Sequence, residues 1–191
     1  MENVEKSEAN ISKLRLQLEN AGIDISIWGT GGYKTIEHLT KEIDCQEIVL
    51  TTDENGELIR ISEVAAATIF FVDDDCKKYR LKEQKQIFID GRERIRPSNG
   101  QSVFEKMKFG EDPTQAMIRG ISEELGIDAD INLKHINTVQ DIADSKSYPG
   151  LQTKSTTHFF DVILNSEQFN PRGYTEEQSD KITYFVWEKI D

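Results

Sequence analysis

The stretch that decides the fold of this chain is residues 104–127, FEKMKFGEDPTQAMIRGISEELGI. Asp112 and Pro113 predict the start of a helix, because an aspartate carboxylate caps free backbone N–H groups and proline fits the first helical position. Gly126 is typical of the residue that ends a helix, so the helix is predicted over residues 113–125. Its apolar residues recur at helical spacing and define the face expected to be buried: Met117, Ile118, Ile121 and Leu125.

Charged residues cluster around this helix. Arg119, Glu123 and Glu124 lie off the apolar face, and the preceding loop carries Lys106 and Glu111. A loop followed by a helix that presents carboxylates is a plausible site for a hard divalent cation such as Mg²⁺. On spacing alone, solvated surface charge is the commoner explanation of such a cluster.

The same segment resembles the Nudix box. That pattern is Gly, five residues, Glu, seven residues, then Arg-Glu-U-x-Glu-Glu-x-Gly-U, where U is a bulky aliphatic residue. Two positions of this chain depart from it: Glu105 stands at the opening Gly, and Gly120 stands at the Glu after Arg. The other positions match in register, namely Glu111, Arg119, Ile121, Glu123, Glu124, Gly126 and Ile127.

The resemblance implies an α/β fold. Nudix domains are α/β/α sandwiches built on a mixed sheet, and this resemblance covers residues 63–191. Residues 1–62 are then expected to form an N-terminal α+β extension, a helix and a hairpin, that shapes substrate access or a homodimer contact.

The resemblance also implies an activity, which is Mg²⁺- or Mn²⁺-dependent hydrolysis of a nucleoside diphosphate linked to another moiety. The substrate of such a pyrophosphatase is a small phosphorylated nucleotide. Arg119 is expected to orient a carboxylate, either Glu111 or Glu123, and Lys106 is expected to steer phosphates. By the same resemblance the metal ligands are Glu111, Glu123 and Glu124.

Gly120 cannot supply the general base or metal ligand that the Nudix pattern places there. An active enzyme therefore needs a substitute carboxylate, and the candidates are Glu105 in the loop and Glu176 or Glu177 before the last strand. Glu177 joins Arg119, Glu123 and Glu124 in the catalytic set that we predict. The alternative is a nucleotide-binding or regulatory module that kept the fold and lost catalysis.

Three arginines, Arg92, Arg94 and Arg96, precede the motif and share one face at strand periodicity. Such a basic stripe in an acidic protein is suited to receive a substrate's phosphates through charge-assisted hydrogen bonds. Pairing with surplus surface carboxylates is an equally good interpretation, and the sequence leaves both open.

The composition narrows the class of protein. The formal net charge of −12 argues against a general nucleic-acid or membrane-surface binder, because phosphate contacts need lysine and arginine. Cys45 and Cys76 are far apart, which favours reduced thiols. The polar, acidic N-terminus does not resemble a signal or transit peptide, and no apolar run has membrane-spanning length. We therefore expect a cytoplasmic protein.

The rest of the chain predicts further elements. Residues 3–20 read as an amphipathic helix, 23–28 as a short strand, and 29–35 as a glycine-rich turn that docks Trp28 and starts a second helix. Residues 47–61 read as a hairpin around Asn55-Gly56. Further strands are predicted near residues 64–72, 79–89, 129–140, 156–164 and 181–187.

Overall fold

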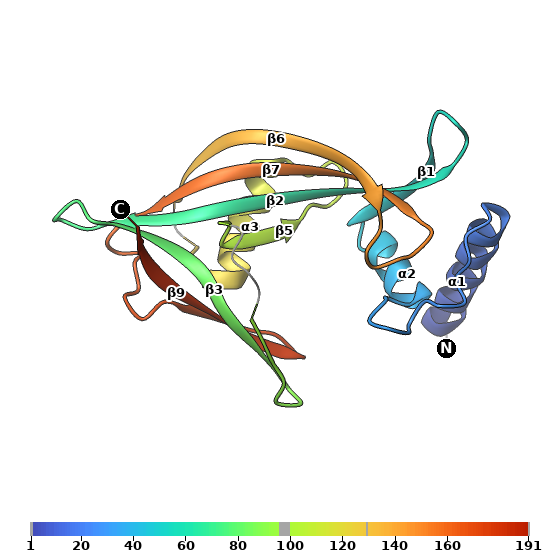
Figure 1. Ribbon diagram of the computed structural model, residues 1–191, viewed down its shortest axis with the longest axis horizontal. Coiled ribbons are helices and arrows are strands. Elements are labelled where there is room, and N and C mark those ends of the chain that lie inside the picture. Colours follow the sequence, from blue (N-terminus) through green and yellow to red (C-terminus); the bar gives the residue numbers. More distant parts are fainter. Residues whose placement is uncertain (1, 96–99, 129, 191) are drawn as a thin grey trace. The chain divides into compact units, whose positions relative to one another are not determined.

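A computed structural model describes residues 2–95, 100–128 and 130–190 of the chain. Figure 1 shows the helices and strands of this part. In chain order they are α1 (Glu2–Asn20), α2 (Ile36–Asp44), β1 (Ile48–Thr52), β2 (Leu58–Val72), β3 (Lys78–Phe88), β4 (Glu93–Arg94), β5 (Val103–Lys106), α3 (Pro113–Leu125), β6 (Asn132–Asp144), β7 (Gln152–Leu164), β8 (Tyr174–Glu177) and β9 (Lys181–Ile190). The predicted N-terminal helix, the hairpin and the later strands are confirmed. Ala129 lies outside the described residues.

The chain divides into two compact units. Unit 1 comprises residues 1–63, 107–110 and 139–156, and unit 2 comprises residues 64–106, 111–138 and 157–191. The predicted boundary between residues 62 and 63 stays a prediction about domains.

Unit 1 is built around Trp28, which is buried and packs against Tyr148 with ring centroids 5.1 Å apart. Its indole Nε1 donates to the carbonyl of Pro149 at 3.0 Å. Other members of this core come from α1, α2, the segment between them, the start of β1 and the residue before β7: Leu14, Leu18, Ile23, Ile36, Leu39, Ile48 and Leu151. The prediction that a helix follows the glycine-rich turn is confirmed, with Thr35 as the N-cap of α2. The contacts of Trp28 are with Tyr148 and Pro149, so docking by the turn itself stays a prediction.

One element of unit 1 differs from the prediction. Residues 23–28 form no strand, because their backbone makes turn hydrogen bonds: Trp28 N–H donates to Ile25 and Thr30 N–H donates to Ile27, at 3.1 and 3.2 Å. Ile23 and Trp28 reach the core from these turns, whereas Ile27 is exposed. The alternation of apolar and polar residues in this segment therefore does not correspond to strand pairing.

Unit 2 contains the sheet region that carries the motif. Ala65, Ala66 and Ala67 of β2 are fully buried, as the continuous apolar run predicts. β2 pairs antiparallel with β5 from Val64↔Lys106 to Ala67↔Val103. β3 pairs antiparallel with β9 along nearly its whole length, and β9 pairs with β8.

The strand order through the sheet is β6-β7-β2-β3-β9-β8. β2 and β7 are neighbours that both begin in unit 1 and end in unit 2, so they run parallel, whereas β2 with β3 and β3 with β9 are antiparallel. The predicted α/β class with a mixed sheet is confirmed. Within unit 2, α3 packs against β5 and β8. No helix among the described residues is both long and apolar enough to cross a membrane.

Candidate active site

Helix α3 forms where the sequence predicts it. Asp112 is the N-cap, and its Oδ1 accepts hydrogen bonds from the backbone N–H groups of Thr114 and Gln115 at 2.9 and 3.2 Å. Gly126 ends the helix in the left-handed conformation at φ 67°. Both ends are therefore fixed by local chemistry, and the charged residues of α3 are held on a rigid element.

The buried face of α3 is rotated from the predicted one. Met117, Ile121 and Leu125 are buried, but Ile118 is 36% exposed, so its assignment to the core is wrong. Gly120 is buried instead, because β5 passes directly over it and its missing side chain admits that close approach. Glu124 lies largely buried and not on a solvated face.

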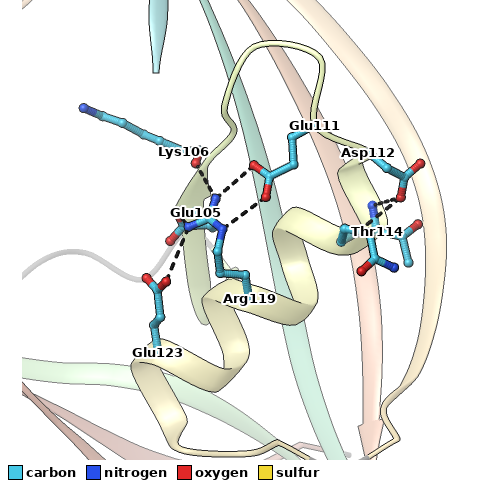
Figure 2. A network of polar contacts seen from close by, with 8 residues as sticks. Glu105, Lys106, Glu111, Asp112, Thr114, Arg119 and Glu123 are labelled. Carbon is cyan, nitrogen blue, oxygen red and sulfur yellow. Dashed lines mark hydrogen bonds and ion pairs between the residues drawn. The ribbon is translucent and has the colours of Figure 1, made fainter. Parts of the chain in front are cut away.

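Arg119 is the centre of the polar network in Figure 2. Its Nε and Nη2 donate to the two carboxylate oxygens of Glu111 at 3.1 and 3.0 Å, the two-point contact typical of arginine and carboxylate. Nη1 contacts Glu105 Oε1 at 2.5 Å, and Nη2 also donates to the Lys106 carbonyl at 3.0 Å. Glu123 Oε1 lies farther away, 3.7 Å from Nη1.

Glu124 carries the largest electrostatic perturbation among the site carboxyls. Its pKa is raised to about 9, first by burial and then by the negative charges of Glu176, Glu105 and Glu83, while a hydrogen bond from the backbone of Phe104 opposes the rise. Burial also raises the pKa of Glu105, although Arg119 opposes that shift. Carboxylates from β3, β5 and β8 therefore act on one position of α3.

A row of polar side chains crosses the sheet beside Glu124. Arg94, Gln86, Thr183 and Glu176 are successive cross-strand partners on β4, β3, β9 and β8, so their side chains share one face. Thr183 is 2% exposed, and among the described residues its hydroxyl has no hydrogen-bond partner. A buried hydroxyl without a partner is unusual in a folded protein, and it lies on the carboxylate side of the sheet.

Glu83 joins this row through a β-bulge. The register of β3 against β9 shifts between Glu83 and Lys85, and Gln86 Nε2 donates to Glu83 Oε2 at 3.2 Å. Glu83 Oε1 is buried, and no partner for it occurs in the described part of the chain. Sequence reasoning missed Glu83, Gln86 and Thr183. The available signal was polar residues at positions of β3 and β9 that should face inward.

The two candidate base residues on β8, Glu176 and Glu177, differ in their exposure to solvent. Burial alternates along β8, so Glu176 is half-buried and Glu177 is exposed. Glu176, not Glu177, is the carboxylate whose charge acts on Glu124. The catalytic role of Glu177 stays a prediction. Its side chain faces solvent, unlike that of its neighbour Glu176.

The predicted arginine stripe is only partly described. Arg92 pairs with Asp90 at 2.7 Å, and the Nε of Arg94 donates to Gln86 Oε1 at 2.9 Å. Both guanidinium groups lie 5.1 Å from the Phe88 ring, whereas Arg96 lies outside the described residues. Lys106 contributes its carbonyl to Arg119, while Figure 2 shows its side chain directed away from the carboxylates. Phosphate binding by these four residues stays a prediction.

The carboxylates around Glu124 do not point to one common position. In residues 2–95, 100–128 and 130–190, no three Asp, Glu, His or Cys side chains stand close enough together to hold a metal ion as they are. The donors are nevertheless the oxygen ligands that Mg²⁺ and Mn²⁺ prefer. A divalent cation would relieve the repulsion around Glu124 and give Glu83 Oε1 a partner, so the residues fit such an ion.

No protein-family model matches this chain, and no curated protein matches it. It is similar to several solved structures. One is the NUDIX domain of Shewanella oneidensis NrtR complexed with ADP ribose, with 12% identity, TM-score 0.37, and coverage of 66% of this chain and 71% of that chain. Another is the E. coli dihydroneopterin triphosphate pyrophosphohydrolase, with 22% identity, TM-score 0.40, and coverage of 68% and 80%. A C. elegans Ap4A hydrolase shows 16% identity, TM-score 0.36, and coverage of 66% and 79%.

These neighbours are Nudix structures. They belong to the family that residues 105–127 resemble.

Proposed function

We propose that this chain is a divalent-metal-dependent hydrolase of a nucleoside diphosphate linked to another moiety, a Nudix-type pyrophosphohydrolase with a rearranged carboxylate set. The observation that supports the proposal is the negative charge that acts on half-buried Glu124 from Glu176, Glu105 and Glu83 and raises its pKa. Burying several carboxylates together is unfavourable unless a cation is taken up, so this arrangement is typical of a metal-binding site.

Glu124 and Glu105 would hold the cation, with Glu123 and Glu176 beside them. Glu111 was predicted as a ligand too, but both of its oxygens accept from Arg119. We therefore propose that Glu111 fixes the orientation of Arg119. Arg119 in turn holds Glu105 at 2.5 Å, so one guanidinium group orders two carboxylates.

When bound, the metal would polarise a phosphoryl oxygen and lower the pKa of the attacking water. The chain's own residues position the reactants and carry the proton. Without metal the pKa of Glu124 is about 9, so its carboxyl group is protonated near neutral pH. It would release that proton when a cation binds. Arg94, at the end of the polar row, would contribute its positive charge to binding of the substrate's phosphates.

The second candidate is a nucleotide-binding or regulatory module without turnover. One observation favours it, because Gly120 removes a carboxylate from the middle of the motif. The two candidates share the fold and a nucleotide ligand, and they differ in metal-dependent hydrolysis.

Calorimetric titration of the metal-free protein with Mg²⁺ and Mn²⁺ tests the proposal first. It is followed by a hydrolysis screen over dinucleoside polyphosphates, nucleoside diphosphate sugars and nucleoside triphosphates. We expect metal binding and turnover of at least one class, with both reduced by at least about a hundredfold in Glu124→Gln. Nucleotide binding without hydrolysis in any metal would support the module instead.

The matched pair Glu176→Gln and Glu177→Gln locates the further carboxylate. The two residues are adjacent on β8, and only Glu176 acts on Glu124. We expect turnover to fall in Glu176→Gln and to persist in Glu177→Gln. The reverse result would assign the role to Glu177.

A further inference from the structure

The two departures from the Nudix pattern lie against each other in the structure. Gly120 sits on the buried face of α3, and Glu105 sits on β5. A Cβ built on Gly120 would lie 2.7 Å from the Cβ and 3.1 Å from the Cγ of Glu105. Real Cβ atoms essentially never approach that closely, so the two side chains compete for one volume.

The carboxylate of Glu105 lies beside the place that a side chain on residue 120 would enter. Its Oε2 is 3.5 Å from the ideal Cβ position of Gly120. That separation matches the span between a glutamate's own Cβ and its carboxylate oxygens. Oε1 contacts Arg119, so the carboxylate is fixed in direction as well as in position.

From this geometry we infer that Glu105 and Gly120 are a reciprocal exchange, in which β5 delivers to the metal position the carboxylate that α3 lacks. The inference rests on the proposed function and names the residue that completes its site. Glu105 would offer its carboxylate to the cation while Oε1 keeps its contact with Arg119.

The exchange needs a glycine at position 120. Glycine in a helix interior is destabilising by about 1 kcal/mol relative to alanine, so its presence calls for a compensating contact. Glu105 provides it, and it cannot yield easily, because Ala65↔Glu105 pairing fixes the backbone of β5 against β2. Restoring a side chain at 120 therefore requires removing the one at 105.

A second observation concerns Thr183, whose strand partner Glu176 acts together with Glu105 on Glu124. Thr183 is only 2% exposed, and its hydroxyl has no hydrogen-bond partner among the described residues. It is the direct cross-strand partner of Glu176. A water or ligand oxygen bound at this site would satisfy that hydroxyl.

The test uses four variants of the full chain: Glu105→Gln, Glu105→Gly, Gly120→Glu, and the double variant Glu105→Gly/Gly120→Glu. Mn²⁺ binding is measured by calorimetry and folding by thermal unfolding. Glu105→Gln keeps the shape and removes the charge, and we expect it to stay folded and bind Mn²⁺ at least about tenfold more weakly. Glu54→Gln, in the exposed hairpin turn, controls for the loss of one negative charge.

Gly120→Glu alone should lower the midpoint of thermal unfolding, because two glutamates then occupy one volume. The double variant should unfold at a higher temperature than Gly120→Glu and bind Mn²⁺ within about threefold of wild type. Such non-additivity is the signature of two residues that substitute for each other.

The outcomes separate the two proposals. Mn²⁺ binding by wild type that Glu105→Gln leaves unchanged overturns the exchange and leaves the proposed function standing. A double variant no better than the sum of its single changes overturns the exchange as well. Absence of Mn²⁺ binding in wild type, with or without nucleotide, overturns the proposed function and the role of Glu105 together.

Discussion

Glu124 is the residue whose protonation should be most visible in solution. Its folded pKa of about 9 lies above the ordinary value of 4.5, so between these limits the folded state binds a proton that the unfolded state has released. Stability rises with pH only where the unfolded state binds more protons, and here it binds fewer. The free energy of unfolding of the metal-free protein should therefore receive a contribution from Glu124 that is present below about pH 4.5 and is lost as pH rises toward 9.

Glu124→Gln should remove that contribution to the pH dependence. Glutamine matches the neutral form in shape, so we expect a flatter stability profile and a variant more stable than wild type above about pH 8. Urea unfolding of metal-free protein at a series of pH values measures this, with Glu54→Gln as control. Parallel profiles for wild type and Glu124→Gln would contradict the assignment.

Arg119 is the second residue with a sharp expectation. A lysine in its place is a single point charge and cannot bond both oxygens of Glu111 while it also reaches Glu105. Arg119→Lys should lose about 1–3 kcal/mol of stability, since buried acceptors are left without donors. It should also weaken Mn²⁺ binding by about tenfold or more.

Urea unfolding and calorimetry measure the two effects of Arg119→Lys. Arg92→Lys is the matched control for stability, because Arg92 is 75% exposed and pairs only at the surface with Asp90. Its unfolding free energy should change by less than about 0.5 kcal/mol. Equal effects of the two substitutions would show that the Arg119 network contributes nothing specific.

At the scale of elements, the approach to β8 depends on one residue. Gly173 has φ 80°, and a Cβ built on it would lie 1.9 Å from the backbone oxygen of Phe185 on β9. The pairing of β8 with β9 places that carbonyl, so it cannot move without loss of the ladder. The position of Glu176, three residues later, follows from this close approach.

Gly173→Ala should therefore destabilise the protein through both strain and collision. Gly91→Ala is a matched control, because Gly91 has φ 82° but nothing lies within 4 Å of its Cβ position. We expect about 1 kcal/mol for Gly91→Ala and at least about 2 kcal/mol more for Gly173→Ala, measured by urea unfolding. Similar values for both would mean that β8 relaxes without penalty.

At the scale of the whole molecule, charge is the dominant feature. The chain has 35 Asp and Glu against 23 Lys and Arg, and most of the surplus is exposed. Three carboxylates that are largely shielded from solvent form ion pairs with arginine. In unit 1, Glu42 pairs with Arg60 at 3.0 Å and Lys34 at 2.6 Å. In unit 2, Arg119 pairs with Glu105 and Glu111. Glu124 differs from these residues, because burial and the charges of Glu176, Glu105 and Glu83 raise its pKa.

Glu42→Gln tests this account in unit 1. Its side chain is 7% exposed, and its loss leaves Arg60, 12% exposed, as a buried charge without its carboxylate. We expect a loss of roughly 3 kcal/mol by urea unfolding. Lys34→Gln removes the partner that is 41% exposed and should change stability by less than about 1 kcal/mol. The opposite order would contradict the assignment.

Local chemistry made much of the fold predictable from the sequence. The ends of α3 follow from Asp112, Pro113 and Gly126, and the hairpin follows from Asn55-Gly56, because each device acts within a few residues. The segment 23–28 failed for the opposite reason. Its alternation of apolar and polar residues is compatible with a strand, but its backbone forms turns from which Ile23 and Trp28 are buried.

The sequence by itself determined that a helix with Arg119, Glu123 and Glu124 follows a loop with Glu111, since those spacings lie along one element. Only the tertiary structure decided that Glu105 fills the space above Gly120, that a bulge turns Glu83 inward, and that Glu176 rather than Glu177 faces Glu124. These are contacts between strands and a helix far apart in the chain. They depend on strand register and on burial, which no local spacing encodes.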